Sequence, residues 1–172
     1  MSSPLAATEY PAYAKRYIDL VPEDDIVAGL EKQGRETAAL LRSISDEKGA
    51  SRYAPDKWSV KTVVRHFTDT ERIYGYRALA IARGEKNSLP GFEEKDYAAA
   101  SDADKQRMRD LADEYESVRR ATVALYRGLS PEAWKRRGLA NDNPATVRGL
   151  AYTTLGHERH HLKVLREKYD VR

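Results

Sequence analysis

The sequence predicts an all-α protein built as a four-helix bundle, and two observations lead to this prediction. Four long segments carry apolar residues at helical spacing, and Gly, Pro and short polar runs separate them. No run of β-branched residues alternates with polar residues between turn signals, so strands are not expected. A chain of 172 residues suits a single domain with a sizeable core. Four amphipathic helices in a domain of this size favour a bundle.

The first two helices have recognisable start or stop signals. The first is expected over residues 23–43, because Pro22 and the acidic run that follows it favour a helix N-terminus. The second is expected over residues 59–83, where Ser59 is a good N-cap candidate and Gly84 a plausible C-terminal stop. Between them, residues 46–57 are expected to form a loop.

The third and fourth helices are expected over residues 104–129 and 145–169. A long loop, residues 84–103, joins the second helix to the third. It includes the run L-P-G-F at residues 89–92, which is too apolar for a spacer. Loops of this length in a compact domain are often functional, so we expect it to pack over a site.

The chain is expected to hold an N-terminal extension, residues 1–20, and one helical domain, residues 21–172. The N-terminus has no apolar core preceded by basic residues, so we do not expect a secretory signal. No segment approaches the ~20 apolar residues that span a membrane. The expected compartment is the cytoplasm.

Charge and cysteine content exclude several classes of site. Charged residues make up 33% of the chain, but both signs are interspersed and the net charge is only +3. The densest basic cluster, Lys135 to Arg137, is short, so no nucleic-acid partner is expected. The chain has no cysteine, which excludes disulfides, iron–sulfur clusters and thiolate zinc sites.

The run H-E-R-H-H at residues 157–161 contains three of the four histidines and matches the pattern H-E-x-x-H. Imidazoles four residues apart on a helix lie on one face and can hold one metal ion. A helical wheel places His157 and His161 near the margin of the buried arc and points His160 into solvent. His66 lies at the edge of the arc of the second helix. We therefore expect His66, His157 and His161 to form an open divalent-metal site.

Two carboxylates fall inside the buried arcs. The wheel places Glu158 close to the centre of the arc of the fourth helix and Glu71 within that of the second. A buried carboxylate is costly unless it is paired. One interpretation is a salt bridge to Arg77, Arg119 or another arginine of the bundle. The other is that the carboxylate orients a metal-binding imidazole. Both are favoured over a general-base role for Glu158.

H-E-x-x-H is also the signature of zinc proteases, in which the glutamate is the general base. The extended form of that motif needs Gly at position 164 and His at 167, where this chain has Val164 and Glu167. The other common form takes a third ligand well downstream, whereas this sequence ends at Arg172. No sheet that would bind a peptide is expected, so a metalloprotease is disfavoured.

Several motifs together resemble the DinB-like superfamily over about residues 21–169. The segments that carry the resemblance are W-S-V-K-T-V-V-R-H at 58–66, D-T-E-R at 69–72, R-A-L-A-I-A-R-G at 77–84, L-P-G-F at 89–92 and G-H-E-R-H-H-L at 156–162. The chain is most similar to the YfiT-like branch, whose members are regarded as metal-dependent hydrolases. The combination is specific, whereas H-E-x-x-H alone is not.

The resemblance implies a four-helix bundle, commonly a homodimer, with one divalent metal on three histidines. In this sequence the ligand positions are His66, His157 and His161. Zinc and nickel are the metals favoured by the resemblance, and iron, manganese and copper are compatible, since imidazole binds several of these ions.

Three functions remain open at this point. The first is a metal-dependent hydrolase acting on a small molecule. The second is an S-transferase that uses an external low-molecular-weight thiol, as relatives in the superfamily do. The third is a non-catalytic, metal-binding stress-response protein. The three-histidine set suits the first two equally.

Overall fold

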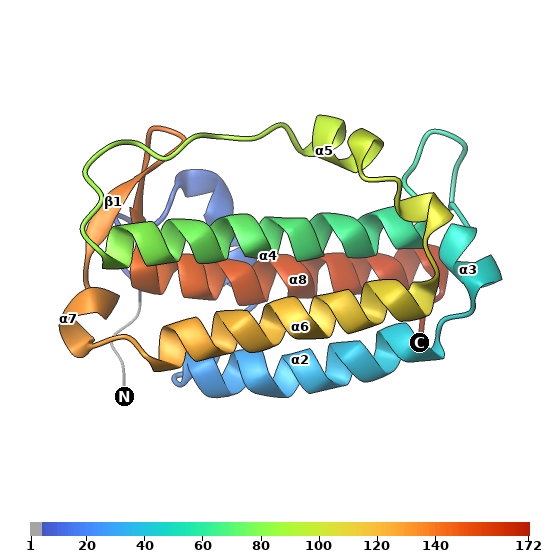
Figure 1. Cartoon of the computed structure of the whole chain (residues 1–172), viewed down its shortest axis with the longest axis horizontal. Coiled ribbons are helices and arrows are strands. Elements are labelled where there is room, and N and C mark those ends of the chain that lie inside the picture. Colours follow the sequence, from blue (N-terminus) through green and yellow to red (C-terminus); the bar gives the residue numbers. More distant parts are fainter. Residues whose placement is uncertain (1–4) are drawn as a thin grey trace.

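The computed structural model describes residues 5–172, and four long helices dominate it (Figure 1). They are α2 (Ile26–Ser43), α4 (Val60–Ala82), α6 (Met108–Arg127) and α8 (Val147–Tyr169). They form a bundle, so the predicted all-α fold is confirmed. No helix among the described residues combines the length and the apolar character needed to cross a membrane.

Shorter elements join and cover these helices. They are the 3-10 turns η1 (Ala12–Ala14) and η2 (Ala103–Lys105), the helices α1 (Lys15–Ile18), α3 (Asp46–Ala50), α5 (Glu94–Ala100) and α7 (Pro131–Trp134), and the strands β1 (Arg137–Ala140) and β2 (Asn143–Thr146).

The ends of the long helices follow local capping chemistry. The side chain of Ser59 accepts a hydrogen bond of 3.0 Å from the backbone N–H of Thr62, which confirms Ser59 as the N-cap of α4. Gly84, with φ of 93°, terminates the same helix as predicted. Asp25 caps α2, which therefore begins at Ile26, three residues later than predicted. Thr146 caps α8, which begins at Val147, two residues later than predicted.

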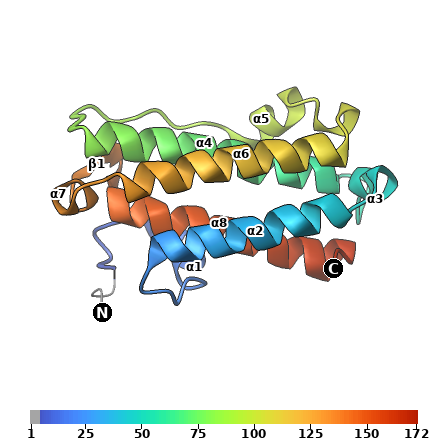
Figure 2. The same cartoon turned by 60° about the horizontal axis from the view of Figure 1, so that its bottom comes forward.

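The order of the helices explains the long loop. α4 and α6 lie side by side and run in the same direction, whereas α2 packs antiparallel to α6 and α8 antiparallel to α4 (Figures 1 and 2). A parallel pair needs a connection that retraces the first helix, which for the 23 residues of α4 is about 35 Å. Residues 83–107 make this return over α4 and place α5 beside it.

A β-hairpin that the sequence analysis did not predict lies between α7 and α8. β1 and β2 pair antiparallel, with Ala140 opposite Asn143. Asn141 and Asp142 form the turn with φ of 50° and 56°, the conformation of a two-residue hairpin loop. The backbone of Leu89 bonds to Leu139 and Asn141 at 2.9 and 2.8 Å, so the hairpin anchors the long connection. The expectation of no strands was wrong because these strands are only four residues long and include Gly138 and Pro144, so they show no alternation of β-branched and polar residues.

Residues 46–57 are not wholly a loop, since α3 occupies their first part. Ser45 caps this short helix by accepting from the N–H of Lys48 at 3.1 Å. Gly49 lies inside α3 rather than breaking it. A Cβ at Gly49 would come 2.6 Å from the side chain of Met108, so the glycine permits close packing against the start of α6.

The N-terminal segment packs along α8. The N–H of Thr146 donates to the carbonyl of Glu9 at 3.0 Å, and α1 lies against the middle of α8. Two glycines of α8 allow this approach: a Cβ at Gly149 would lie 2.3 Å from the carbonyl oxygen of Glu9, and one at Gly156 would lie 2.1 Å from that of Tyr17. Residues 5–20 therefore contribute to the surface of the bundle beside the motif helix.

The core consists of two apolar halves separated by a polar belt. One half includes Leu30, Ile81 and Leu155. The other half includes Leu41, Phe67 and Leu165. The polar belt is a set of buried side chains, one to three from each long helix, near the middle of the bundle: Gln33, Thr37, His66, Thr70, Glu71, Arg119, His157 and Glu158. This belt contains most of the candidate functional residues.

Candidate metal centre

Three histidine side chains from α4 and α8 meet at one face of the polar belt. Nε2 of His157 lies 3.2 Å from Nε2 of His66 and 3.1 Å from Nε2 of His161. The possible ligand atoms of all three residues lie within 4.8 Å of one another. The structure thus brings together the three histidines that the wheel selected.

Burial and aromatic packing hold the cluster in place. His66 and His157 are each 5% exposed, and His161 is partly exposed. The ring of Trp58 lies 5.0 Å from that of His66, and the ring of Tyr17 lies 5.1 Å from that of His157, centroid to centroid. These contacts restrict the orientation of the imidazoles before any ligand binds.

The cluster holds its histidines neutral. Loss of hydration on burial lowers the pKa of His66 to about 4 and that of His161 to about 3. Burial, and then the neighbouring histidines, place the pKa of His157 well below its usual range. All three are therefore neutral at pH 7, and metal binding requires the neutral form of imidazole.

The spacing of the nitrogens fits a shared metal ion. Nitrogen ligands about 2.0–2.1 Å from one ion are separated by about 2.9 Å at a right angle and about 3.4 Å at the tetrahedral angle. The observed 3.1 and 3.2 Å lie between these values. The residues present therefore suit a divalent transition metal, with His66, His157 and His161 as its ligands.

His160 does not join the cluster, but it does not point into solvent as predicted. It is half-buried, and its ring lies 5.5 Å from that of Tyr17. The prediction of full exposure was wrong because α1 covers this face of α8, which a wheel of one helix cannot show. Its pKa is lowered, first by burial and then by the charge of Arg16.

Glu158 belongs to a buried ion network on α2, α4, α6 and α8. Arg119 donates to both oxygens of Glu71 at 2.8 Å and also to Oε2 of Glu158. Thr37 and Tyr115 donate to Oε1 of Glu158 at 2.5 and 2.8 Å. Of the alternatives left by the sequence, the structure shows the salt bridge to Arg119. Both carboxylate oxygens of Glu158 accept hydrogen bonds from these partners. Glu158 therefore has a structural role rather than that of a general base.

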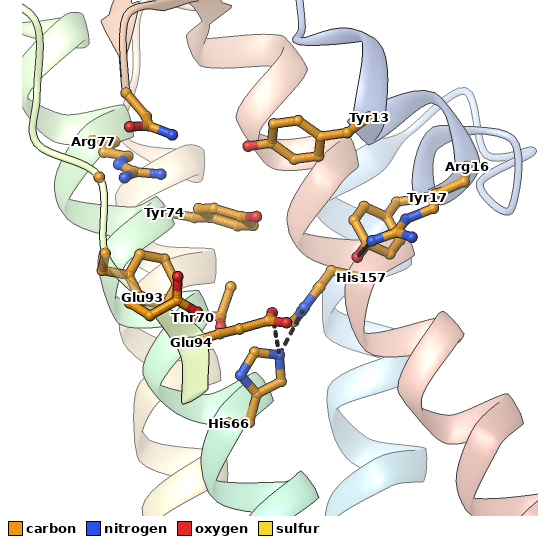
Figure 3. A pocket seen from close by; sticks show the side chains of 13 residues that line it. Tyr13, Arg16, Tyr17, His66, Thr70, Tyr74, Arg77, Glu93, Glu94 and His157 are labelled. Carbon is orange, nitrogen blue, oxygen red and sulfur yellow. Dashed lines mark hydrogen bonds and ion pairs between the residues drawn. The ribbon is translucent and has the colours of Figure 1, made fainter. Parts of the chain in front are cut away.

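A cavity of about 320 Å³ opens beside the histidines (Figure 3). Its walls come from α4, α8, the N-terminal segment, the hairpin turn and the long connection. The residues that line it are Tyr13, Arg16, Tyr17, His66, Thr70, Tyr74, Arg77, Gly91, Phe92, Glu93, Glu94, Asn141 and His157. Figure 3 shows His66 near one end, Arg77 near the other and Tyr74 between them. The long connection therefore packs over the site, as its length and apolar content predicted.

Glu94 adds a carboxylate that sequence reasoning missed. Its Oε2 lies 4.0 Å from Nε2 of His66, and the side chain is 57% exposed. Figure 3 shows it reaching from the long connection toward His66 and His157. The available signal was the group Glu93, Glu94 and Asp96 at the N-cap and first turn of α5, because carboxylates are favourable at a helix N-terminus.

The N-terminal segment was also missed as part of the site. Tyr13, Arg16 and Tyr17 line the cavity, and the guanidinium of Arg16 donates to the hydroxyl of Tyr17 at 2.6 Å. A signal was present in α8, where Gly149 and Gly156 are two turns apart on one face. Glycines at this spacing permit another backbone to approach closely.

Comparisons with known proteins agree with this fold. A family model described as the DinB superfamily matches residues 30–165. No curated protein matches the sequence. Among solved structures, YfiT from Bacillus subtilis matches with a TM-score of 0.66 and 18% identity, covering 92% of this chain and 93% of that one. That protein is described as a probable metal-dependent hydrolase with an unusual four-helix bundle topology.

Proposed function

This chain belongs to the DinB superfamily, and we propose that it is a metal-dependent hydrolase of small molecules. In this proposal His66, His157 and His161 hold one divalent ion, with zinc and nickel as the leading candidates. The observation that carries the proposal is the convergence of three neutral imidazole nitrogens beside a cavity of about 320 Å³. The description of the Bacillus subtilis protein of the same fold supports it.

The residues around the cluster have distinct tasks. A divalent ion in such a site supplies Lewis-acid chemistry, which activates water or a thiol and polarises a carbonyl or phosphoryl group. His66, His157 and His161 come from two helices on one side, which leaves the cavity side open for substrate. Tyr17 packs against His157 and limits access of bulk water to it.

Glu94 is the group that we assign to proton transfer. Its carboxylate oxygen is 4.0 Å from Nε2 of His66, so it would be placed to take up a proton from a water or thiol that an ion held by the three histidines activates. Its exposed position allows it to pass that proton to solvent. Glu158 cannot take this task, because its oxygens are bound to Thr37, Tyr115 and Arg119.

Metal content of untagged protein tests the ligand assignment. We expect one divalent ion per chain in the wild type and in His160→Ala, and loss of the ion in His66→Ala, His157→Ala and His161→Ala. The reason is that only the last three contribute to the converging nitrogens. Elemental analysis after dialysis decides it, with circular dichroism showing that each variant is folded. Full occupancy in His66→Ala, or loss only in His160→Ala, would reject the assignment.

Turnover assays separate the candidate functions. The metal-loaded protein is tested against ester, amide and phosphoester substrates, and against common electrophiles with added low-molecular-weight thiols. We expect hydrolysis, with Glu94→Gln losing about 10²–10⁴-fold in rate while keeping its metal. Activity only with an added thiol would assign an S-transferase. Metal binding without either activity would assign a non-catalytic role.

A further inference from the structure

Arg77 is a buried arginine without a carboxylate partner. Three described arginines are buried: Arg77 is 4% exposed, Arg119 3% and Arg65 8%. Arg119 contacts two carboxylates, and Arg65 contacts Glu114 at 2.5 Å. The ion pairs among residues 5–172 do not include Arg77, which donates through Nη2 to the carbonyl of Pro90 at 2.6 Å. Of the three, Arg77 alone lines the cavity beside the histidines.

The surroundings of Arg77 compensate its charge only in part. The guanidinium carbon lies 5.9 Å from the ring centroids of both Tyr74 and Phe92, at the outer limit of a cation–π contact. A guanidinium has five N–H donors, and one carbonyl uses only part of them. A buried charge without a counter-ion is destabilising, so its presence in a cavity wall indicates that an anion completes the site.

Thr70 is a second polar group left without a partner in the same wall. Its Oγ1 is buried and makes no hydrogen bond to any residue that the structure describes. Thr70 lies one turn from His66 and two turns from Arg77 on α4, so the three side chains share one face of the helix. Figure 3 shows Thr70 on the stretch of wall between them. A hydroxyl at this point can donate to, or accept from, the middle of a molecule that reaches from one end to the other.

The two ends of the cavity offer different groups (Figure 3). The histidine end would hold a divalent ion, with Glu94 and the exposed Arg16 beside it, whereas the opposite end offers the buried guanidinium of Arg77. A molecule that places its reacting bond at the histidines can therefore place an anionic group at Arg77.

We propose that the substrate carries an oxyanion group, a carboxylate or a phosphate, that binds Arg77 while its reacting bond lies at the histidine cluster. This inference rests on the proposed hydrolase function and adds the substrate class. His66 and Arg77 are eleven residues apart on α4, or about 16 Å of helix rise. Both side chains lean toward the N-terminus of the helix, so this rise sets the scale of the distance that the substrate has to span.

Hydroxamates that bind metals allow a direct test. The probes are a homologous series of ω-carboxyalkyl hydroxamates, from succinic to sebacic, their methyl esters and the matching ω-phosphonates. Calorimetry measures their affinity for the metal-loaded protein. At the best length we expect the acid to bind about 10–100-fold more tightly than its neutral ester, the effect of one charge-assisted contact. Comparing the acids with the phosphonates tells which oxyanion the site prefers.

Variants assign the preference to one side chain. Arg77→Gln should remove the difference between acid and ester, and Arg77→Lys should keep part of it because the charge remains. Arg72→Gln is the matched control: Arg72 is on the same helix, but it faces α6 and pairs with Glu114 at 2.7 Å, so it should keep the full preference. A melting temperature of Arg77→Gln at or above that of the wild type supports the proposal, because the substitution removes an unpaired buried charge.

The outcomes separate this inference from the proposed function. Equal binding of acid and ester at every length, or an acid preference that survives in Arg77→Gln, overturns the role of Arg77. If Arg77→Gln does not fold, the acid–ester comparison on the wild type still decides. Acetohydroxamate, which has no anionic tail, reports on the metal centre alone. If acetohydroxamate does not bind, the proposed function fails. The anion site is then tested separately by adipate binding to the metal-free protein. Adipate should bind Arg72→Gln as tightly as the wild type and Arg77→Lys more weakly, and equal affinity for both variants would overturn the role of Arg77.

Discussion

At the scale of single residues, the buried arginines differ in how their charge is compensated. Arg119 is bound by Glu71 and Glu158, and further hydrogen bonds complete this network. Within residues 5–172 the only hydrogen-bond partner of Arg77 is the backbone carbonyl of Pro90, and no carboxylate pairs with it. The charge of Arg119 is compensated by carboxylates within the bundle. Arg77 instead has N–H donors that face the cavity and can bind a ligand.

Substitutions in the ion network of Arg119, Glu71 and Glu158 should lower the free energy of unfolding by different amounts. Arg119→Gln strands two buried carboxylates and should cost about 3–5 kcal/mol of unfolding free energy. Glu158→Gln leaves Arg119 paired with Glu71, so its cost should be smaller, about 1–3 kcal/mol. Urea denaturation measures both. Glu116→Gln, in an exposed pair with Arg42, is the control and should change stability by less than about 0.5 kcal/mol.

Metal content of the same variants checks the role of Glu158. Glu158→Gln should bind as much metal as the wild type, because the hydrogen bonds of Glu158 lead to Thr37, Tyr115 and Arg119. A variant with unchanged melting and greatly weakened metal binding would show instead that this carboxylate supports the histidine cluster.

The neutral histidines predict how the metal-free protein responds to pH. In the folded state burial lowers their pKa, whereas in the unfolded chain they titrate near 6.5. Below pH 6.5 the unfolded chain binds protons that the folded chain excludes, so stability is lost as pH falls. The loss approaches about 1.4 kcal/mol per pH unit for each excluded proton. Urea denaturation of EDTA-treated protein at pH 7 and 5 tests this. The difference should be smaller in His157→Asn, and an equal difference would contradict the explanation.

At the scale of elements, the site depends on how segments distant in sequence are brought to α8. α1 approaches one face of it at Gly156, and the long connection passes over the adjoining face of α4. The connection has to make this passage because α4 and α6 are parallel neighbours. The topology of the bundle thus places a cover over the histidines.

Two glycine substitutions should have opposite effects. In Gly156→Ala the added Cβ would lie 2.1 Å from the carbonyl oxygen of Tyr17, so α1 must move and stability should fall by about 1–3 kcal/mol. Gly75→Ala, on α4, has no atom within 4 Å of the added group and should gain about 0.5–1 kcal/mol from helix propensity. Urea denaturation gives both values. Hydrogen exchange in α1 should rise only in Gly156→Ala, and unchanged exchange there would contradict the packing argument.

At the scale of the whole molecule, we predict a homodimer. The resemblance to the superfamily implies it, and four of the eleven tyrosines, at positions 13, 53, 76 and 97, remain 45–58% exposed. Exposed aromatic residues are favoured at interface cores. Light scattering at micromolar concentration should give twice the mass of the 19.5-kDa chain. A single-chain mass over the whole concentration range would reject the prediction.

The four long helices and the candidate ligand set could be predicted from the amino-acid sequence. These features follow from local rules: the 3.6-residue period, the capping of α4 by Ser59, the stop at Gly84 and the spacing of His157 and His161 on one helix. Information of this kind lies within one or two turns of chain, so it can be read without knowing the neighbours.

The side chains that those helices present to each other, and the segments that cover them, could not be predicted in this way. The pairing of Glu158 with Arg119, the shielding of His160 by Tyr17 and the lack of a carboxylate at Arg77 all depend on segments far apart in the chain. The contact between the hairpin and the long connection likewise joins segments far apart in the chain. The physical reason is that burial and charge compensation are properties of a neighbourhood, and one-dimensional periodicity specifies a face without specifying its neighbours.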